Sequence, residues 1–206
     1  MKHQNRLAAR IFVLAFVVSC WGCGTKGPGR PGFDPEASAQ QALATYDANS
    51  DQSIDEEEVK KSPGLTAAFK SIDTDSDGKL TAEEISTRVN YYKSAPSIVI
   101  SGSTRVTYKG RPLPDARVVF EPEPFLGSDF VSCEGTTDFN GIASVQGADP
   151  NYPGLYLGFY TVRITKAKQN GDEMLPAKYN TESILGYEAT DDQNIGLADI
   201  INFKMK

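Results

Sequence analysis

The chain has very little of what most enzyme active sites require. Its 206 residues include one histidine, His3, three cysteines and three methionines. Ser-His-Asp and Cys-His catalysis need a histidine base, and zinc hydrolases usually need histidine ligands. No Walker loop and no Gly-rich dinucleotide turn follows a strand-like segment. We therefore expect no catalytic residues and predict that the protein is not an enzyme.

The chain also lacks an apolar run of comfortable membrane-spanning length. The run from Ile11 to Val18 is short and follows the basic residues Lys2, Arg6 and Arg10. A charged start before a short apolar segment is typical of a secretory signal, whereas a membrane span needs about 20 apolar residues.

The sequence Val17-Val18-Ser19-Cys20 resembles a bacterial lipobox, in which the cysteine becomes lipidated and N-terminal. We predict a signal peptide over residues 1–20, lipidation of Cys20, and a lipid-anchored, extracytoplasmic location in the cell envelope. Cys23 is a poorer lipobox match, and an ordinary cleaved signal is the alternative. Cys23 and Cys133 could pair in an oxidising compartment, or Cys133 is a buried strand residue.

Basic charge is scarce, since the formal net charge is -6 and removal of Lys2, Arg6 and Arg10 would take it to -9. An acidic mature chain argues against nucleic acid and favours cations or basic partners. Residues 21–35 are rich in Gly and Pro without periodicity, which predicts a flexible tether.

Acidic and polar side chains recur with one spacing in two twelve-residue segments, at loop positions 1, 3, 5, 7, 9 and 12. They are Asp47, Asn49, Asp51, Ser53, Asp55 and Glu58 in loop one, and Asp73, Asp75, Asp77, Lys79, Thr81 and Glu84 in loop two. Both segments resemble the EF-hand calcium loop, where position 7 supplies its carbonyl, so Lys79 is no objection. We predict Ca²⁺ as the cofactor of both loops.

The two loops are not equal. Loop two has Gly78 at position 6, where positive φ is needed, and loop one has Gln52, which costs roughly 1 kcal/mol there. Ile54 and Leu80 at position 8 are expected to pair the loops. Loop two is therefore predicted to be the better site.

Helical periodicity flanks both loops. The apolar positions are Ala39, Ala42, Leu43 and Tyr46 before loop one, Leu65, Ala68, Phe69 and Ile72 before loop two, and Ile85, Val89 and Tyr92 after it. Asp55 with Glu58, and Thr81 with Glu84, have capping-box spacing for exiting helices. We predict an EF-hand pair over residues 36–94. The alternative is an acidic, solvated helical hairpin with decayed loops.

After Lys93 the composition changes to short β-forming runs separated by turns, which predicts a β domain over residues 97–206. The expected strands are Ile98–Ile100, Thr104–Tyr108, Ala116–Phe120, Phe130–Cys133, Ile142–Val145, Phe159–Thr165 and Ile200–Met205. We read Asp138–Gly141 as a hairpin turn, and Asp191, Asp192 and Asn194 as a solvated loop. The fold prediction is multidomain α plus β, with an EF-hand pair followed by an antiparallel, seven-stranded sandwich.

Two stretches, 106–120 and 135–141, with Tyr160–Thr165, resemble the carboxypeptidase regulatory-like, transthyretin-like β-sandwich. The closing Pro176–Asn180 motif is similar to the version found in secreted planctomycete-type lipoproteins. The resemblance covers residues 97–206 and implies a prealbumin-like sandwich used for folding support, adhesion or binding. The hydrolase version of this fold depends on histidine, which residues 97–206 lack.

Two functions fit this composition. The first is a calcium-binding, membrane-anchored module whose β-sandwich is structural or binds an unknown envelope protein or glycan. A glycan surface could use Tyr152, Tyr156, Phe159 and Tyr160, although aromatic strands usually fill cores. The alternative is a calcium-responsive regulator that exposes a partner-binding surface. The scarcity of methionine, with Met174 the one between the signal and the last strand, disfavours the regulator.

Overall fold

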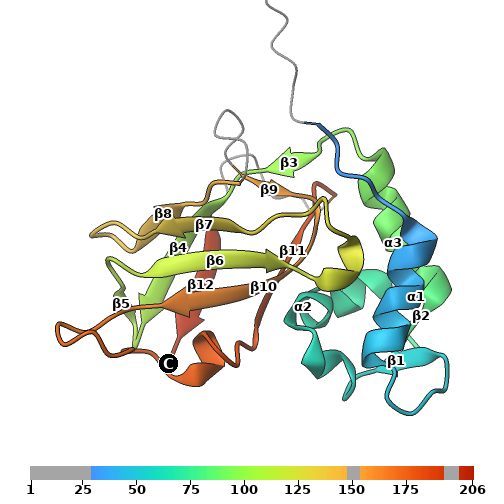
Figure 1. The fold of residues 1–206 in the computed structure, drawn as a ribbon, viewed down its shortest axis with the longest axis horizontal. Helices are drawn as coiled ribbons and strands as arrows, with labels where there is room; N and C mark the ends of the chain where they lie inside the picture. The colour runs from blue at the N-terminus through green and yellow to red at the C-terminus, as the bar shows by residue number, and fades with distance from the viewer. Residues whose placement is uncertain (1–28, 148–153, 193–199) are drawn as a thin grey trace, which may run out of the picture.

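The computed structural model describes residues 29–147, 154–192 and 200–206 (Figure 1). The predicted signal peptide, Cys20 and Cys23 lie outside these residues. The first 66 described residues, 29–94, form α1 (Pro35–Tyr46), β1 (Ser53–Asp55), the 3-10 turn η1 (Val59–Lys61), α2 (Pro63–Ile72), β2 (Lys79–Thr81) and α3 (Ala82–Ser94).

Each α-helix begins where the sequence provides a side-chain cap. Asp34 accepts a hydrogen bond from the amide of Ala37 at α1, and Ser62 accepts from the amide of Leu65 at α2. α3 opens with a full capping box between Thr81 and Glu84. The apolar positions predicted for the helices lie within α1, α2 and α3, and those predictions are confirmed.

The helix predicted to leave loop one is wrong, because only η1 follows Glu58. Ser62 is extended, with φ -120° and ψ 94°, and Pro63 is the first residue of α2. A residue before proline is disfavoured in helical conformation, so Pro63 stops any helix that begins at loop one. The described residues therefore contain three α-helices where an EF-hand pair has four.

Two four-stranded sheets follow. One has the order β11-β10-β6-β7, and the other is β12-β4-β5 with β8 also paired to β4. The strands are β4 (Ser103–Tyr108), β5 (Arg111–Pro112), β6 (Arg117–Pro122), β7 (Cys133–Thr136), β8 (Ile142–Ser144), β10 (Gly158–Thr165), β11 (Leu185–Ala189) and β12 (Ile201–Met205). β3 (Val99–Ile100) and β9 (Leu155–Tyr156) form a separate pair.

The sheets correct the predicted fold class. The strands are short and divided among small sheets, and β12 runs parallel to β4, so the arrangement is not the expected seven-stranded antiparallel sandwich. β11 has no counterpart among the predicted strands, and β7 begins at Cys133, where the predicted strand ended. The prediction of an EF-hand pair followed by such a sandwich is wrong on both counts.

The helices lie against one sheet and share a core with it (Figure 1). Phe125, Leu157 and Phe159 from the β region pack in the same buried cluster as the apolar faces of α1, α2 and α3. A Cβ on Gly186 of β11 would come within 1.7 Å of the Pro63 carbonyl oxygen. Glycine at 186 thus allows the start of α2 to lie directly on β11.

A second core lies between the two four-stranded sheets. It includes Val106, Phe120, Val162, Ile164 and Phe203. One face of the sheet formed by β11, β10, β6 and β7 therefore packs on the other sheet, and the helices cover part of the opposite face, where α2 lies against β10 and β11.

Candidate metal site

The two predicted loops are joined by a short antiparallel ladder. β1 pairs with β2, and Ile54 lies opposite Leu80. Both side chains are fully buried. The prediction that position 8 pairs the loops is confirmed.

Both loops have the same backbone conformation at their tightest points. Gln52 and Gly78 at position 6 have φ of 70° and 83°, and Ser50 and Ser76 at position 4 have φ of 61° and 62°. The expectation of positive φ at position 6 is confirmed for both loops. Gln52 is strained there because its Cβ disfavours the left-handed region.

Loop two brings three acidic side chains together. Carboxylate oxygens of Asp73, Asp75 and Glu84 all lie within 4.8 Å of one another, and no other group of three metal-ligating side chains among residues 29–147, 154–192 and 200–206 is as close. These three carboxylates can hold a metal ion. Asp73 comes from the end of α2 and Glu84 from the first turn of α3, so the two helices position the cluster.

Backbone amides orient this cluster. Glu84 accepts from the amides of Thr74, at 2.9 Å, and Thr81, at 3.0 Å, while Asp73 accepts from the amide of Gly78 at 3.1 Å. Partial burial opposes ionisation of Glu84, but these hydrogen bonds outweigh it and hold the pKa below its ordinary value of 4.5. Glu84 is therefore ionised at neutral pH, as a metal ligand must be.

The other predicted metal ligands of loop two, Asp77, Lys79 and Thr81, are not part of the cluster of three carboxylates. Asp77 accepts from the amide of Lys79 at 2.8 Å, and the Thr81 hydroxyl donates to Glu84 at 2.8 Å. The Lys79 side chain leaves its own loop and donates to Asp51 of loop one.

Loop one arranges its acids differently. Glu58 is buried and accepts from the amides of Ala48, Asn49 and Asp55, at 2.8 Å, 3.1 Å and 3.1 Å. Asp55 accepts from the amide of Glu58 at 2.9 Å, which gives the reciprocal bonds of a capping box ahead of η1.

The remaining predicted ligands of loop one accept hydrogen bonds from groups within the same loop. Asp47 accepts from the amide of Gln52 at 3.0 Å, and Asn49 accepts from the amide of Asp51 at 2.8 Å. The Ser53 hydroxyl donates to Asp51 at 2.6 Å, and this bond, followed by that of Lys79, lowers the pKa of Asp51 to about 2.

Two buried glutamates fasten the loop-bearing helices to the sheet. Glu123 accepts from the Tyr46 hydroxyl at 3.0 Å and from the Gly64 amide at 2.9 Å. Glu188 on β11 accepts from Arg88 at 2.6 Å and from the Tyr92 hydroxyl at 2.5 Å. Tyr46 directly precedes Asp47, so its hydrogen bond to Glu123 fixes the chain next to the first ligand position of loop one.

Sequence reasoning missed this network. The sequence pattern predicts neither a strand nor a site at Glu188, although Tyr187 and Ala189 flank it in a short apolar run. Asp191 and Asp192, read as solvated, contact α3: Tyr91 donates to Asp191, and Arg88 donates to Asp192. That prediction is corrected, while Asn194 lies outside the described residues.

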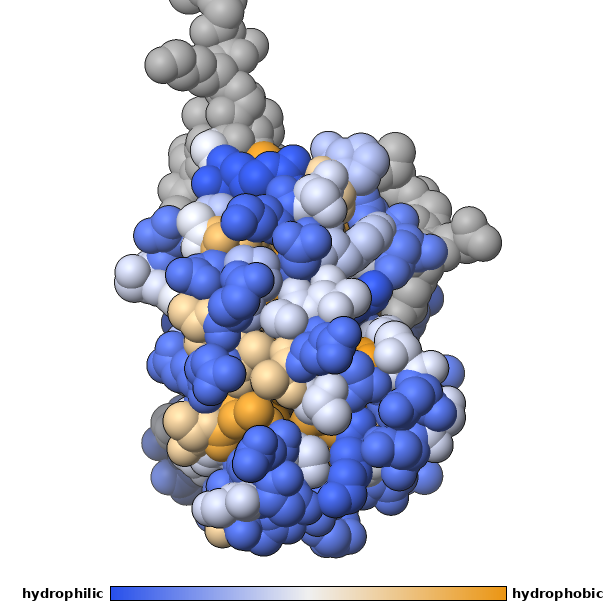
Figure 2. Space-filling model, turned by 90° about the vertical axis from the view of Figure 1, so that its right-hand side faces the viewer, coloured by the Kyte–Doolittle hydropathy of each residue, from blue (hydrophilic) through white to orange (hydrophobic). Residues whose placement is uncertain are grey.

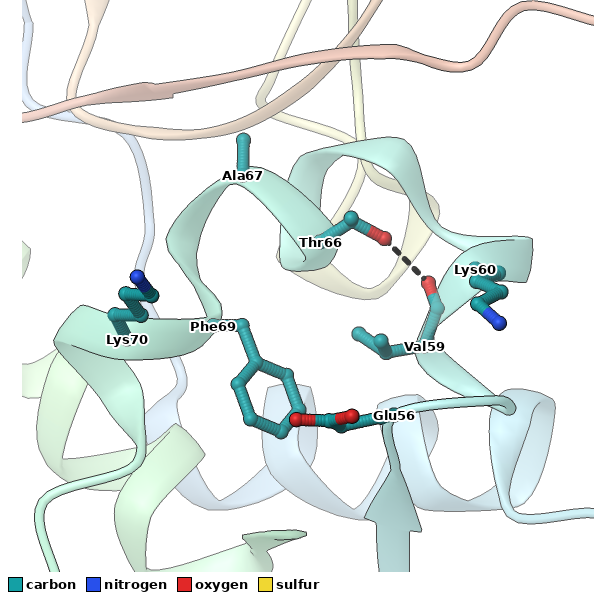
Figure 3. A pocket seen from close by; sticks show the side chains of 7 residues that line it. All are labelled: Glu56, Val59, Lys60, Thr66, Ala67, Phe69 and Lys70. Atoms are coloured by element: carbon teal, nitrogen blue, oxygen red, sulfur yellow. Dashed lines mark hydrogen bonds between the residues drawn. The ribbon is translucent and has the colours of Figure 1, made fainter. Parts of the chain in front are cut away.

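An apolar hollow lies beside loop one. It has a volume of about 380 Å³ and is lined by Glu56, Val59, Lys60, Thr66, Ala67, Phe69 and Lys70. Figure 3 shows the hydrogen bond across it, from the Thr66 hydroxyl to the Val59 carbonyl at 2.8 Å. Figure 2 shows that this helical side of the molecule is mostly hydrophilic, with an apolar area in its lower half and smaller apolar spots elsewhere.

Three further expectations concern the β region. Asp138–Gly141 is a turn, since the Gly141 amide donates to the Asp138 carbonyl at 2.9 Å. Cys133 is free and buried, and burial raises its pKa to about 11. Phe159 and Tyr160 are buried in cores, so they do not form the considered glycan surface, and Tyr152 lies outside the described residues.

Comparison with family models, with curated proteins and with solved structures finds no match to this chain. Among the described residues, none of the helices has the length and apolar character to cross a membrane.

Proposed function

We propose that this protein binds calcium at loop two and is a membrane-anchored, extracytoplasmic lipoprotein with a non-catalytic role. The observation that carries the calcium proposal is the grouping of Asp73, Asp75 and Glu84 within 4.8 Å in a loop with the spacing and backbone turns of an EF-hand loop. Calcium prefers carboxylate and carbonyl oxygens in flexible shells of six to eight ligands, and loop two offers this donor set.

Its role is that of a structural clamp. Asp73 is the C-cap of α2 and Glu84 lies in the first turn of α3, so an ion bound by both would join two helices that already pack on β10 and β11. Ions bound only by the native state stabilise it in proportion to the logarithm of their concentration. Extracellular modules of this type bind at about 10⁻⁴ to 10⁻³ M, and we expect loop two in that range.

Calorimetric titration of the full chain with calcium tests this proposal. Loss of a residue that only orients a metal ligand typically weakens metal binding by about 10- to 100-fold. Glu84→Gln removes a proposed ligand itself and should weaken calcium binding by more than that. Glu83→Gln is the matched control, because Glu83 is exposed and adjacent but outside the ligand positions. Absence of calcium binding by the parent chain, or equal losses in both variants, would reject loop two as the site.

The second candidate is the calcium-responsive regulator. The hollow next to loop one favours it, because Val59 directly follows Glu58 and lines the apolar wall together with Phe69. The buried bonds of Glu123 and Glu188 oppose the opening of the helices that such a regulator needs. Calcium-dependent binding of the dye ANS would favour the regulator, and unchanged dye fluorescence would favour the clamp.

The β region is proposed to be structural or to bind an envelope protein or glycan. The anchor is proposed at Cys20. Fatty-acid labelling that is lost in Cys20→Ala and kept in Cys23→Ala is the expected result, and the reverse pattern would move the anchor to Cys23.

A further inference from the structure

The side chain of Lys79 belongs to loop two but contacts loop one. Its Nζ lies 2.9 Å from Oδ2 of Asp51, the residue at position 5 of loop one. The β1–β2 ladder holds the two loops side by side, with Asp55 opposite Lys79, and the long Lys79 side chain reaches from there to Asp51. The ammonium group of a loop-two residue thus contacts a carboxylate that is an expected calcium ligand of loop one.

We propose that Lys79 is a tethered cation that competes with calcium for loop one, so that the two loops fill in order, loop two first. This inference rests on the proposed calcium binding of loop two and adds a residue that regulates the second site.

Both oxygens of Asp51 are engaged. Oδ2 accepts from Lys79, and Oδ1 accepts from the Ser53 amide at 3.0 Å and from its hydroxyl at 2.6 Å. Calcium at position 5 would have to displace the ammonium, since the two cations repel each other at the distance of a shared carboxylate.

Loop two carries no equivalent obstacle. In the described part of the chain, no ion pair involves Asp73, Asp75 or Glu84. The two loops therefore share their backbone turns but differ in whether a basic side chain already contacts a ligand.

The contact is exposed, and this sets the size of the effect. The side chains of Lys79 and Asp51 are 44% and 36% exposed, so water and salt screen the pair. Exposed ion pairs are individually weak, and the divalent charge of calcium enlarges the competition, so we expect about a threefold to tenfold change in affinity.

The structure supplies one reporter for each loop. The Gln52 amide donates to Asp47 at 3.0 Å, and the Gly78 amide donates to Asp73 at 3.1 Å. Both acceptors are position 1 ligands, so the amide proton shifts of Gln52 and Gly78 would follow calcium binding in loop one and loop two separately.

The experiment is a calcium titration of the isotope-labelled full chain, read by NMR, in the parent and in Lys79→Met. The backbone carbonyl that Lys79 offers to loop two is kept in this variant. We expect the Gln52 midpoint to move to about threefold to tenfold lower calcium, and less so at high salt. The Gly78 midpoint should move by a smaller factor, because the Lys79 ammonium lies near Asp77 but forms its ion pair with Asp51.

Lys60→Met is the matched control, because Lys60 forms an exposed ion pair with Glu57 of loop one, which is not a ligand position. It should move the Gln52 midpoint by less than half as much as Lys79→Met. Asp51→Asn provides a second arm: once the acceptor carries no charge, Lys79→Met should add little further change.

The outcomes separate the two proposals. If neither amide responds to calcium in the parent chain, calcium binding itself is rejected. If Gly78 responds while Gln52 is silent in every variant, or the Gln52 midpoint is the same with and without Lys79, the competition is overturned and the clamp proposal stands.

Discussion

Loop one and loop two have the same ligand spacing and the same positive-φ turns at positions 4 and 6, yet they group their acids differently. Loop two runs through a full capping box into the thirteen-residue helix α3. Loop one runs into η1, a single 3-10 turn of three residues. The arrangement of the carboxylates therefore differs together with two other features. These are the element that follows each loop and the side chain of Lys79, which contacts loop one.

A second contrast lies behind the loops, where each has its own buried glutamate. Glu123 accepts from neutral donors, including Tyr46 and Thr161, near the start of loop one. Glu188 accepts from the cationic Arg88, which is 9% exposed and lies on the helix that leaves loop two. The first contact is a set of ordinary hydrogen bonds, and the second is a buried ion pair.

The largest expected effect comes from exchanging these two glutamates for alanine. Glu188→Ala removes the buried partner of Arg88 and the acceptor of Tyr92 but leaves the ion pair of Arg88 with Asp192, so it should cost about 3 kcal/mol of unfolding free energy, the low end for breaking a buried pair. Glu123→Ala leaves neutral donors unpaired and should cost about 1–3 kcal/mol. Urea denaturation measures both values. A larger loss in the Glu123 variant would contradict the contrast between the two contacts.

The next effect concerns position 6. Gln52→Gly removes a side chain from a residue with φ of 70° and should stabilise the protein by about 1 kcal/mol. Gly78→Gln is the reciprocal change and should destabilise it by a similar amount, since φ there is 83°. Thermal unfolding in the presence of a chelator compares them. Changes of the same sign in both variants would mean that the two turns are not equivalent.

The smallest effect is a dependence on acid pH that involves the helix after loop two. The hydrogen bond from Arg88 holds the pKa of Asp192 below its ordinary value of 3.8. The stabilisation is therefore complete above pH 3.8 and is lost as the pH falls through the lower, folded-state pKa.

Asp192→Asn should accordingly cost less than about 1 kcal/mol at pH 7, because Asp192 is partly exposed. The difference from the parent should shrink below pH 3.8 in denaturant titrations at several pH values. A difference that grows in acid would show that Asp192 has the opposite pKa shift.

Much of the local structure followed from the sequence, because its causes are local. The caps Thr81 and Glu84 and the apolar period of Ile85, Val89 and Tyr92 predict α3. Gly78 and Gln52 at position 6 predict the positive φ values. These patterns depend on residues within a few positions of one another, so they can be read directly along the chain.

The parts that could not be predicted depend on distant contacts. β11 contains Gly186, and glycine in a sequence disfavours a strand. Its position in β11 is explained only by the distant contact with Pro63, which leaves no room for a side chain. The contact of Lys79 with Asp51 joins residues 28 positions apart in two different loops, which the β1–β2 ladder holds side by side. Pro63 is a local signal against a fourth helix, because the residue before a proline is disfavoured in helical conformation.

Arg30 has a mechanical consequence for an anchored chain. Its guanidinium donates to the carbonyls of Tyr92, Lys93 and Ala95, at 3.0 Å, 3.0 Å and 2.9 Å, so it fastens the start of the described chain to the last turn of α3. Thirteen helical residues span about 20 Å, and the metal loop lies at the other end of that helix (Figure 1). If the chain is anchored as proposed, tension applied at its N-terminus would reach the folded region at Arg30 and the last turn of α3, at the end of the helix opposite loop two.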